Sequence, residues 1–361
     1  MTIKPKNSIL DIAPYVPGKS GTGKKKSIIK LSSNETPLGT SAKALDAIKN
    51  SLGIPSRYPD GSAIELRKNL ANFNNININN IICGNGSDEI LSMFANCFAG
   101  QNDEIIYSEH GFLVYPIATK AAGAIPIIAK EKNYKANVEE IIKVCSSKTK
   151  VCFIANPNNP TGTYLTRDEL ITLRQKLPIN CLLVIDSAYA EYVEKEDYTN
   201  GFDLVNKFEN VACTRTFSKI YGLAALRIGW AYASLDVIDY LNRIRLPFNI
   251  NTIAQNAAIA AIQDQLFIRK AIKHNNIWKN YIEKELIDLG INIIPGVGNF
   301  VLAQYNNIEQ ANNCYIYLEE NNIFVRKVSE YGLADCLRIT VGLEKENIYL
   351  IKIIKNFIEN N

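Results

Sequence analysis

The middle of the chain, from about residue 59 to residue 265, alternates between two patterns. Short apolar runs typical of buried strands are each followed by a stretch in which apolar residues recur at helical spacing. This order predicts a mainly parallel sheet with helices on both faces, because the chain has to cross over the sheet before it begins the next parallel strand. We therefore expect an α/β fold. The clearest pairs are "NIICGNG" with "EILSMFANCFAG", "KVCFIANPNNPTG" with "RDELITLRQKL", and "CLLVIDSAYAEY" with "NGFDLVNKF".

The sequence divides into three parts around this core. Residues 1–30 carry a cluster of prolines and glycines and are interpreted as an irregular N-terminal arm. Residues 50–265 are predicted to form a large domain, and one long helical stretch that ends at Gly290 leads out of it. Residues 31–49 together with 266–361 are predicted to form a smaller α+β domain, because strand-like runs precede a closing amphipathic helix.

Composition limits the kind of partner. The 361 residues are 47% hydrophobic and 21% charged, which is ordinary for a globular protein with a large core. The 40 basic and 36 acidic residues leave a net charge of +4, too small for a nucleic-acid surface, so small-molecule ligands are expected. No apolar run is long enough for a membrane span, and the N-terminus lacks a signal-peptide core. Eight cysteines without a CxxC pair predict reduced thiols in a cytoplasmic protein, and only two histidines predict no metal site.

Two glycine-rich strings resemble nucleotide-binding motifs but lack essential residues. In "GKSGTGKK", Lys25 stands where a phosphate-binding loop needs Ser or Thr to hold magnesium. In "GNGSDE", Glu89 replaces the third glycine of a dinucleotide fingerprint, which argues against a nicotinamide-dependent oxidoreductase. The second string still follows a strand and opens a helix, so the backbone of Gly86, Ser87 and Asp88 can bind a phosphate. A plain capped helix is the alternative interpretation.

Polar residues follow two of the predicted strands. Asp186 ends the apolar run "LLVID", with Tyr189 three residues further on, and Asn159 lies in the proline-rich loop "NPNNPTG". Because parallel strands place their carboxyl ends at one edge of the sheet, these side chains are expected to lie near a ligand there. Taken singly, each of them also fits a turn or a capping residue.

The segment "TRTFSKIYGLAALRIGW" contains two cations in apolar surroundings, Lys219 and Arg227, and no acid. Burying an unpaired cation is costly, so an electrophilic or anionic ligand is expected to meet them; a surface lysine is the alternative for Lys219. With the strand-end groups they match pyridoxal phosphate, whose aldehyde condenses with an amine and whose ring nitrogen has to stay protonated, here by Asp186. The other predicted cofactor contacts are Asn159 and Tyr189 at the ring oxygen, Gly86, Ser87, Asp88, Ser218 and Arg227 at the phosphate, and Thr216 beside them.

These motifs resemble those of the fold type I aminotransferases, and the resemblance covers residues 15–342. It rests on "TFSKIYGLAALRIGW", in which the lysine and the arginine are eight residues apart, supported by "NPNNPTG" and "VIDSAYAEY" in the expected order. It implies a pyridoxal-phosphate enzyme of that fold, in which Phe112 stacks on the pyridine ring. It further implies a homodimer in which Tyr58 reaches the cofactor phosphate of the neighbouring subunit. The catalytic residues that it implies are Lys219, Asp186 and Tyr189.

Shorter motifs resemble the branch of this family that acts on histidinol phosphate. They include "APYVPGKS", "LSSNETPLG", "SRYPDG", "HGFLVY", "VRKV" and "LRITVG". The resemblance implies amino transfer between L-histidinol phosphate and 2-oxoglutarate, which gives glutamate, in histidine biosynthesis. It also implies that Tyr15, Arg326 and Arg338 bind the substrate phosphate and later the carboxylates of glutamate. A solvated strand residue is the alternative for Arg326.

Other functions of the same fold stay open. An aromatic amino-acid aminotransferase or a phosphothreonine decarboxylase would keep Lys219, Asp186 and the arginine pair. A ligand-sensing regulator without catalytic activity is a candidate from a different class. We expect residues 1–30 to be too short for the DNA-binding domain that such regulators usually carry.

Overall fold

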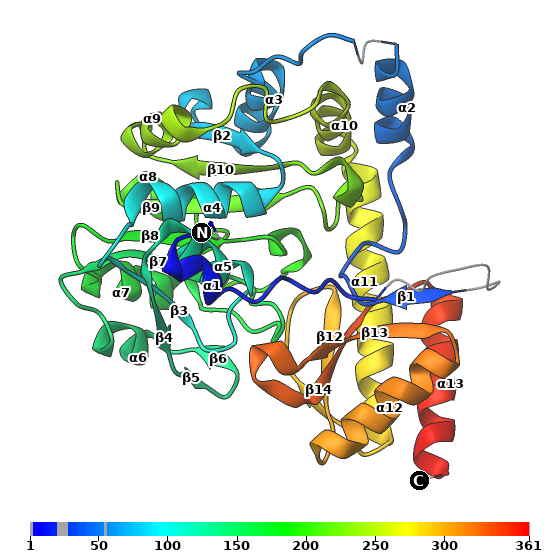
Figure 1. Cartoon of the computed structure of the whole chain (residues 1–361). Helices are drawn as coiled ribbons and strands as arrows, with labels where there is room; N and C mark the ends of the chain where they lie inside the picture. Colours follow the sequence, from blue (N-terminus) through cyan, green and yellow to red (C-terminus); the bar gives the residue numbers. More distant parts are fainter. Residues whose placement is uncertain (1–2, 20–27, 54–55, 361) are drawn as a thin grey trace.

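The computed structural model describes residues 3–19, 28–53 and 56–360, and its larger sheet has seven strands (Figure 1). β10 runs antiparallel to both of its neighbours, and the remaining pairs are parallel. The alternating sequence pattern therefore predicted the sheet correctly. In spatial order the strands are β2 (Ile81–Gly84), β10 (Gly229–Ala233), β9 (Val211–Thr216), β8 (Leu182–Asp186), β7 (Thr149–Ala155), β3 (Glu104–Ser108) and β4 (Ile125–Ala129).

Helices cover both faces of this sheet. Along β8, Leu182 and Val184 pack into one core cluster, whereas Leu183 and Ile185 pack into the cluster on the opposite face. Strands buried on both faces are continuous apolar runs, which explains why "LLVI" does not alternate with polar residues. The cluster around Leu182 includes α4 (Ser87–Phe98), α5 (Val114–Ala122) and α9 (Leu235–Ile244). The opposite cluster includes α3 (Ile64–Asn74), α6 (Val138–Lys143), α7 (Arg167–Lys176), α8 (Phe202–Lys207) and α10 (Thr252–Gln263).

A second sheet of five strands lies in the C-terminal part of the chain (Figure 1). Its edge strand comes from the N-terminal region, because β1 pairs in parallel with β13. Three helices, α11 (Gln265–Asp288), α12 (Ile308–Glu320) and α13 (Glu344–Glu359), share a separate apolar core with this sheet. In spatial order the strands are β1 (Ile29–Leu31), β13 (Ile323–Val328), β14 (Leu333–Thr340), β12 (Phe300–Gln304) and β11 (Asn292–Ile294).

The helical stretch that was expected to continue to Gly290 is two helices. α10 ends at Gln263 and α11 begins at Gln265, with Asp264 between them at φ −93° and ψ 63°. The Asp264 carboxylate accepts a hydrogen bond from the backbone N–H of Phe267 and so caps the second helix. The prediction of one helix was therefore wrong at this residue, because a local cap interrupts an otherwise continuous apolar pattern.

The segment before the larger sheet contacts both parts of the molecule. While β1 joins the smaller sheet, α2 (Ala42–Ser51) packs against α10.

The domain limits predicted from the sequence are kept as a proposal. Most of "GKSGTGKK" falls in residues 20–27, outside the described residues. None of the helices in the described ranges has the length and apolar character that a membrane span requires. The shorter elements are α1 (Asn7–Leu10), β5 (Glu131–Lys132), β6 (Lys135–Ala136) and the 3-10 helices η1 (Ile78–Asn80), η2 (Ala190–Tyr192), η3 (Ala224–Leu226) and η4 (Ser329–Tyr331).

Candidate active site

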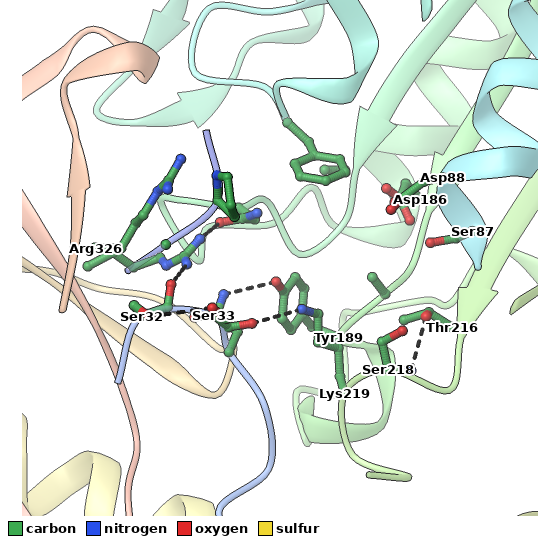
Figure 2. A pocket seen from close by; sticks show the side chains of 18 of the residues that line it. Ser32, Ser33, Ser87, Asp88, Asp186, Tyr189, Thr216, Ser218, Lys219 and Arg326 are labelled. Carbon is green, nitrogen blue, oxygen red and sulfur yellow. Dashed lines mark hydrogen bonds between the residues drawn. The ribbon is translucent and has the colours of Figure 1, made fainter. Parts of the chain in front are cut away.

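A cavity of about 280 Å³ opens at the carboxyl ends of β8 and β9 and is bordered on its other side by β13 and β14 (Figure 2). This is the edge of the sheet at which the sequence placed the ligand. Most of the predicted site residues line it, although they come from distant parts of the chain. They are Tyr15, Ser87, Asp88, Phe112, Asn159, Asp186, Tyr189, Thr216, Ser218, Lys219, Arg227, Arg326 and Arg338.

Asp186 is a buried acid at the end of β8. The Tyr115 hydroxyl donates to its Oδ2 at 3.1 Å, and the Thr214 hydroxyl donates to its Oδ1 at 2.9 Å. Burial raises the pKa of Asp186 to about 6, and the two hydrogen bonds act in the opposite direction. A cation beside this carboxylate would favour its ionised form, so the site suits a protonated ring nitrogen.

Lys219 lies in the loop after β9 and reaches into the cavity. Its Nζ donates a hydrogen bond to the backbone oxygen of Ser33 at 3.2 Å and lies 5.6 Å from the centre of the Tyr189 ring (Figure 2). Among the residues that the structure describes, no acid forms an ion pair with Lys219. Within the described part of the chain, its amine contacts a neutral acceptor and an aromatic face.

Arg227 forms a cation site at the start of α4. Its Nη1 donates to the Ser218 hydroxyl at 3.2 Å, and its Nη2 pairs with the Asp88 carboxylate at 3.3 Å. The expectation that Arg227 has no acid partner was wrong, because Asp88 approaches it from a distant segment. Gly86 has a φ of +84°, and a Cβ there would lie 2.4 Å from the Arg227 guanidinium. The first backbone amides of the helix and this guanidinium can together bind a phosphate.

Three further predicted residues surround the space between these groups. Tyr189 accepts a hydrogen bond from the Asn34 side-chain amide at 2.9 Å. Asn159 accepts one from Arg338, so its side chain faces the end of the cavity where Arg338 lies. Phe112 lines the cavity with its ring edge-on to Tyr115, at a centroid distance of 5.9 Å. Its aromatic face is available for stacking.

Two buried arginines lie side by side at the other end of the cavity. Arg326 and Arg338 are direct partners in the register of β13 and β14, and they are 7% and 5% exposed. Arg326 pairs with Glu330 at 3.0 Å and lies over the Tyr15 ring, whereas Arg338 donates to the Ser32 oxygen at 2.7 Å. Burial lowers the pKa of Arg338, and its Nε has no hydrogen-bond partner among the described residues. The excess positive charge makes this end a site for an anion.

The structure separates Tyr58 from the other predicted site residues. Its side chain is 82% exposed and stacks on Phe248 at 4.5 Å, outside the cavity. The prediction that it reaches a neighbouring subunit stays a prediction. The sequence did not predict Tyr115 and Thr214, which hydrogen-bond Asp186. Asn34 lies in the motif "LSSNETPLG", but no role was predicted for it.

The fold is that of a family of transferases. Residues 26–354 match the model of the aminotransferase class I and II family, and the chain belongs to this family. Two curated relatives are named histidinol-phosphate aminotransferase. That of Zymomonas mobilis subsp. mobilis is 46% identical over 95% of this chain and 94% of its own length, and that of Paramagnetospirillum magneticum is 43% identical over 98% of each. The crystal structure of histidinol-phosphate aminotransferase from Sinorhizobium meliloti in complex with pyridoxal 5'-phosphate has a TM-score of 0.88 and 25% identity, covering 93% of this chain and 92% of that one.

Enzymes of this family use pyridoxal phosphate, and the cavity fits this cofactor. The fit rests on three observations: an amine without an ion pair, a buried acid with a raised pKa, and a guanidinium beside the start of α4. We propose that Lys219 and Asp186 meet the aldehyde and the ring nitrogen. Asn159 and Tyr189 would meet the ring oxygen, Phe112 the ring face, and Gly86, Ser87, Asp88, Thr216, Ser218 and Arg227 the phosphate end.

Proposed function

We propose that this chain transfers the amino group of L-histidinol phosphate to 2-oxoglutarate in L-histidine biosynthesis. The products would be 3-(imidazol-4-yl)-2-oxopropyl phosphate and L-glutamate. The observation that carries the proposal is the pair of buried arginines, Arg326 and Arg338. Among the described residues this pair has one carboxylate partner, Glu330, and it faces the cavity of Lys219. Two relatives at 46% and 43% identity, both named for this reaction, support the same substrate.

The described side chains suit the proton movements of such a reaction. When bound, pyridoxal phosphate withdraws electrons from the substrate Cα. The Lys219 amine is placed to take the Cα proton and to return it, since no described acidic residue holds that amine in an ion pair. Asp186 would hold the proton on the ring nitrogen, and the positive charge there would favour the ionised form of Asp186. Tyr189 and Asn159 would bind the ring oxygen. Arg227, which hydrogen-bonds Ser218, would bind the cofactor phosphate together with it.

The arginine pair has to serve two different anions. Histidinol phosphate brings a phosphate and no carboxylate, whereas glutamate brings two carboxylates. Guanidinium groups bind both through paired, charge-assisted hydrogen bonds, so Arg326 and Arg338 can accept either substrate in turn. Tyr15, whose ring lies 5.8 Å from the Arg326 guanidinium carbon, would border the same anion site.

Class I aminotransferases are typically dimers. We propose that this chain is a homodimer in which Tyr58 reaches the cofactor phosphate of the partner subunit. The exposed stack of Tyr58 on Phe248 supports this, because a large aromatic pair on a surface is typical of an interface. We also propose a cytoplasmic location, in keeping with a biosynthetic role and eight free cysteines.

A substrate panel with a matched pair of variants tests the proposed reaction. Wild-type protein should transaminate histidinol phosphate at least tenfold more efficiently than phenylalanine, and it should not decarboxylate phosphothreonine. Lys219→Ala should lower kcat by at least about 10³-fold, because Lys219 supplies the one amine among the described residues that line the cavity. Lys270→Ala, on the exposed face of α11, is the control and should keep wild-type rates. Faster turnover of phenylalanine or phosphothreonine would contradict the proposed substrate.

A further inference from the structure

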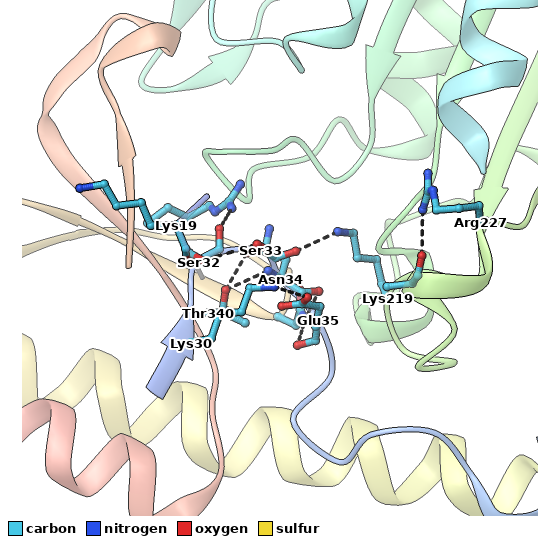
Figure 3. A network of polar contacts seen from close by, with 12 residues as sticks. Lys19, Lys30, Ser32, Ser33, Asn34, Glu35, Lys219, Arg227 and Thr340 are labelled. Carbon is cyan, nitrogen blue, oxygen red and sulfur yellow. Dashed lines mark hydrogen bonds and ion pairs between the residues drawn. The ribbon is translucent and has the colours of Figure 1, made fainter. Parts of the chain in front are cut away.

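Three consecutive residues of the N-terminal region contact three different groups of the candidate active site. The Ser32 oxygen accepts a hydrogen bond from Arg338 at 2.7 Å, and the Ser33 oxygen accepts one from Lys219 at 3.2 Å (Figure 3). The next residue, Asn34, donates from its side-chain amide to the Tyr189 hydroxyl at 2.9 Å. Ser32 and Ser33 make these contacts through their backbone oxygens, whereas Asn34 uses its own side chain. A substitution can therefore remove the Asn34 contact directly.

The Asn34 side chain is held in one orientation. Its backbone N–H donates to the Thr340 hydroxyl oxygen at 3.0 Å, and the single proton of that hydroxyl is donated to Asn34 Oδ1, also at 3.0 Å. The side-chain oxygen therefore faces Thr340, and the NH₂ group has to face Tyr189. Asn299 donates to the Asn34 backbone oxygen at 3.0 Å, and Asn34 itself is 1% exposed. A buried hydrogen-bond network of this kind fixes geometry.

This orientation decides the direction of the Tyr189 hydroxyl. Because its oxygen already accepts a hydrogen bond from Asn34, its own O–H can donate a hydrogen bond into the cavity. A hydrogen bond received by a hydroxyl also makes that hydroxyl a stronger donor. The phenol is thereby prepared to donate to an anionic oxygen.

We propose that Asn34 is a positioning residue that directs the Tyr189 hydroxyl toward the ring oxygen of the cofactor. The inference rests on the proposed function only in its choice of pyridoxal phosphate as the bound group. Thr340 would act with Asn34 by fixing its amide. Thr340 follows Arg338 by two residues on β14. The strand that carries Arg338, the proposed substrate-binding arginine, therefore also holds the Asn34 amide that directs the Tyr189 hydroxyl.

The expected effect is on the spectrum of the holoprotein. A donor to an anionic ring oxygen stabilises the proton-poor form of the bound cofactor, so a weaker donor raises the pH midpoint of its absorbance change. Asn34→Gly removes the amide and suits the φ of 57° at this position. It should raise the midpoint by roughly 0.5–1 pH unit and lower kcat about tenfold, with KM little changed. Asn34→Asp, which can only accept, should raise the midpoint further.

Three variants distinguish positioning from a general structural effect. Thr340→Val leaves the amide of Asn34 free to turn and should raise the midpoint, whereas Thr340→Ser keeps the hydroxyl and should restore the wild-type value. Glu35→Gln, at a half-exposed residue paired with Lys30, is the matched control and should leave the midpoint unchanged.

The titration is carried out on holoproteins saturated with pyridoxal phosphate. Wild-type midpoints in both Asn34→Gly and Asn34→Asp would overturn the inference. So would a shift in Glu35→Gln as large as that in Asn34→Gly, or a shift in Thr340→Ser as large as that in Thr340→Val. Because the readout needs only bound cofactor, it is independent of the substrate. A wild-type protein that binds the cofactor without transaminating histidinol phosphate would overturn the proposed function and leave this inference standing.

Discussion

The buried surroundings of Asp186 disfavour its ionised carboxylate when no cation is bound beside it. Burial raises its pKa from 3.8 to about 6, so the folded, cofactor-free protein binds more protons than the unfolded chain between these two values. Its stability should therefore fall as the pH rises through this window. A protonated ring nitrogen beside the carboxylate would remove the cost of ionisation.

Replacing Asp186 by Asn separates stability from cofactor binding. Cofactor-free Asp186→Asn should be more stable than wild type by about 1–3 kcal/mol at pH 8, and the difference should shrink as the pH falls toward 4. The same variant should bind pyridoxal phosphate at least about tenfold more weakly, because the ring nitrogen loses its partner. Urea denaturation at several pH values and absorbance titration with the cofactor measure the two effects. Equal stability of both proteins at pH 8 would contradict the raised pKa.

At the scale of elements, the start of α4 depends on one residue without a side chain. Gly86 has a φ of +84°, and an added Cβ would lie 2.4 Å from the Arg227 guanidinium. Gly86→Ala should therefore displace Arg227, weaken cofactor binding by about tenfold or more and cost about 1–3 kcal/mol of stability. Gly100→Ala, where nothing lies within 4 Å of the added Cβ, is the control. Cofactor titration measures the affinity, and thermal denaturation measures the stability. Equal cofactor affinities of the two variants would contradict the proposed phosphate site.

Local patterns predicted the elements well, whereas contacts between elements escaped them. The apolar run before Asp186 predicted β8 because a strand buried on both faces needs no alternation. No spacing connects Asp186 with Tyr115 on α5 or Thr214 on β9, because these contacts arise only when the sheet and its helices are assembled. The same holds for Asp88 and Arg227. The break between α10 and α11 at Asp264 was missed for a local reason. A single capping residue interrupts an apolar pattern that continues on both sides of it.

At the scale of the whole molecule, the cavity joins parts of the chain with separate cores. The larger sheet supplies Asp186 and the loop of Lys219, whereas the smaller sheet supplies Arg326 and Arg338. The segment of Asn34 bridges them through Tyr189 and Thr340. The proposed chemistry and the proposed anion binding would therefore be linked through one short segment.

The proposed dimer extends this sharing of the site to a second subunit. If Tyr58 serves the partner's cofactor, each site needs Lys219 from one chain and Tyr58 from the other. Tyr58→Ala and Lys219→Ala are then each impaired in all sites of their own homodimers. A hybrid of the two has one intact site, because its Lys219 and its Tyr58 come from different chains. Equal mixing with subunit exchange gives hybrids in about half of the dimers, so activity should rise to about a quarter of wild type.

The control for this experiment is a pair of defects that lie in one cavity of the same chain. Lys219 and Arg227 both line the cavity described here, so a hybrid of Lys219→Ala with Arg227→Ala has no intact site and should gain nothing on mixing. Activity is measured after subunit exchange, and size-exclusion chromatography establishes that the mixtures are dimeric. No gain on mixing Tyr58→Ala with Lys219→Ala would mean that Tyr58 does not act across the interface. Its exposed stack on Phe248 would then be explained by packing within the dimer alone.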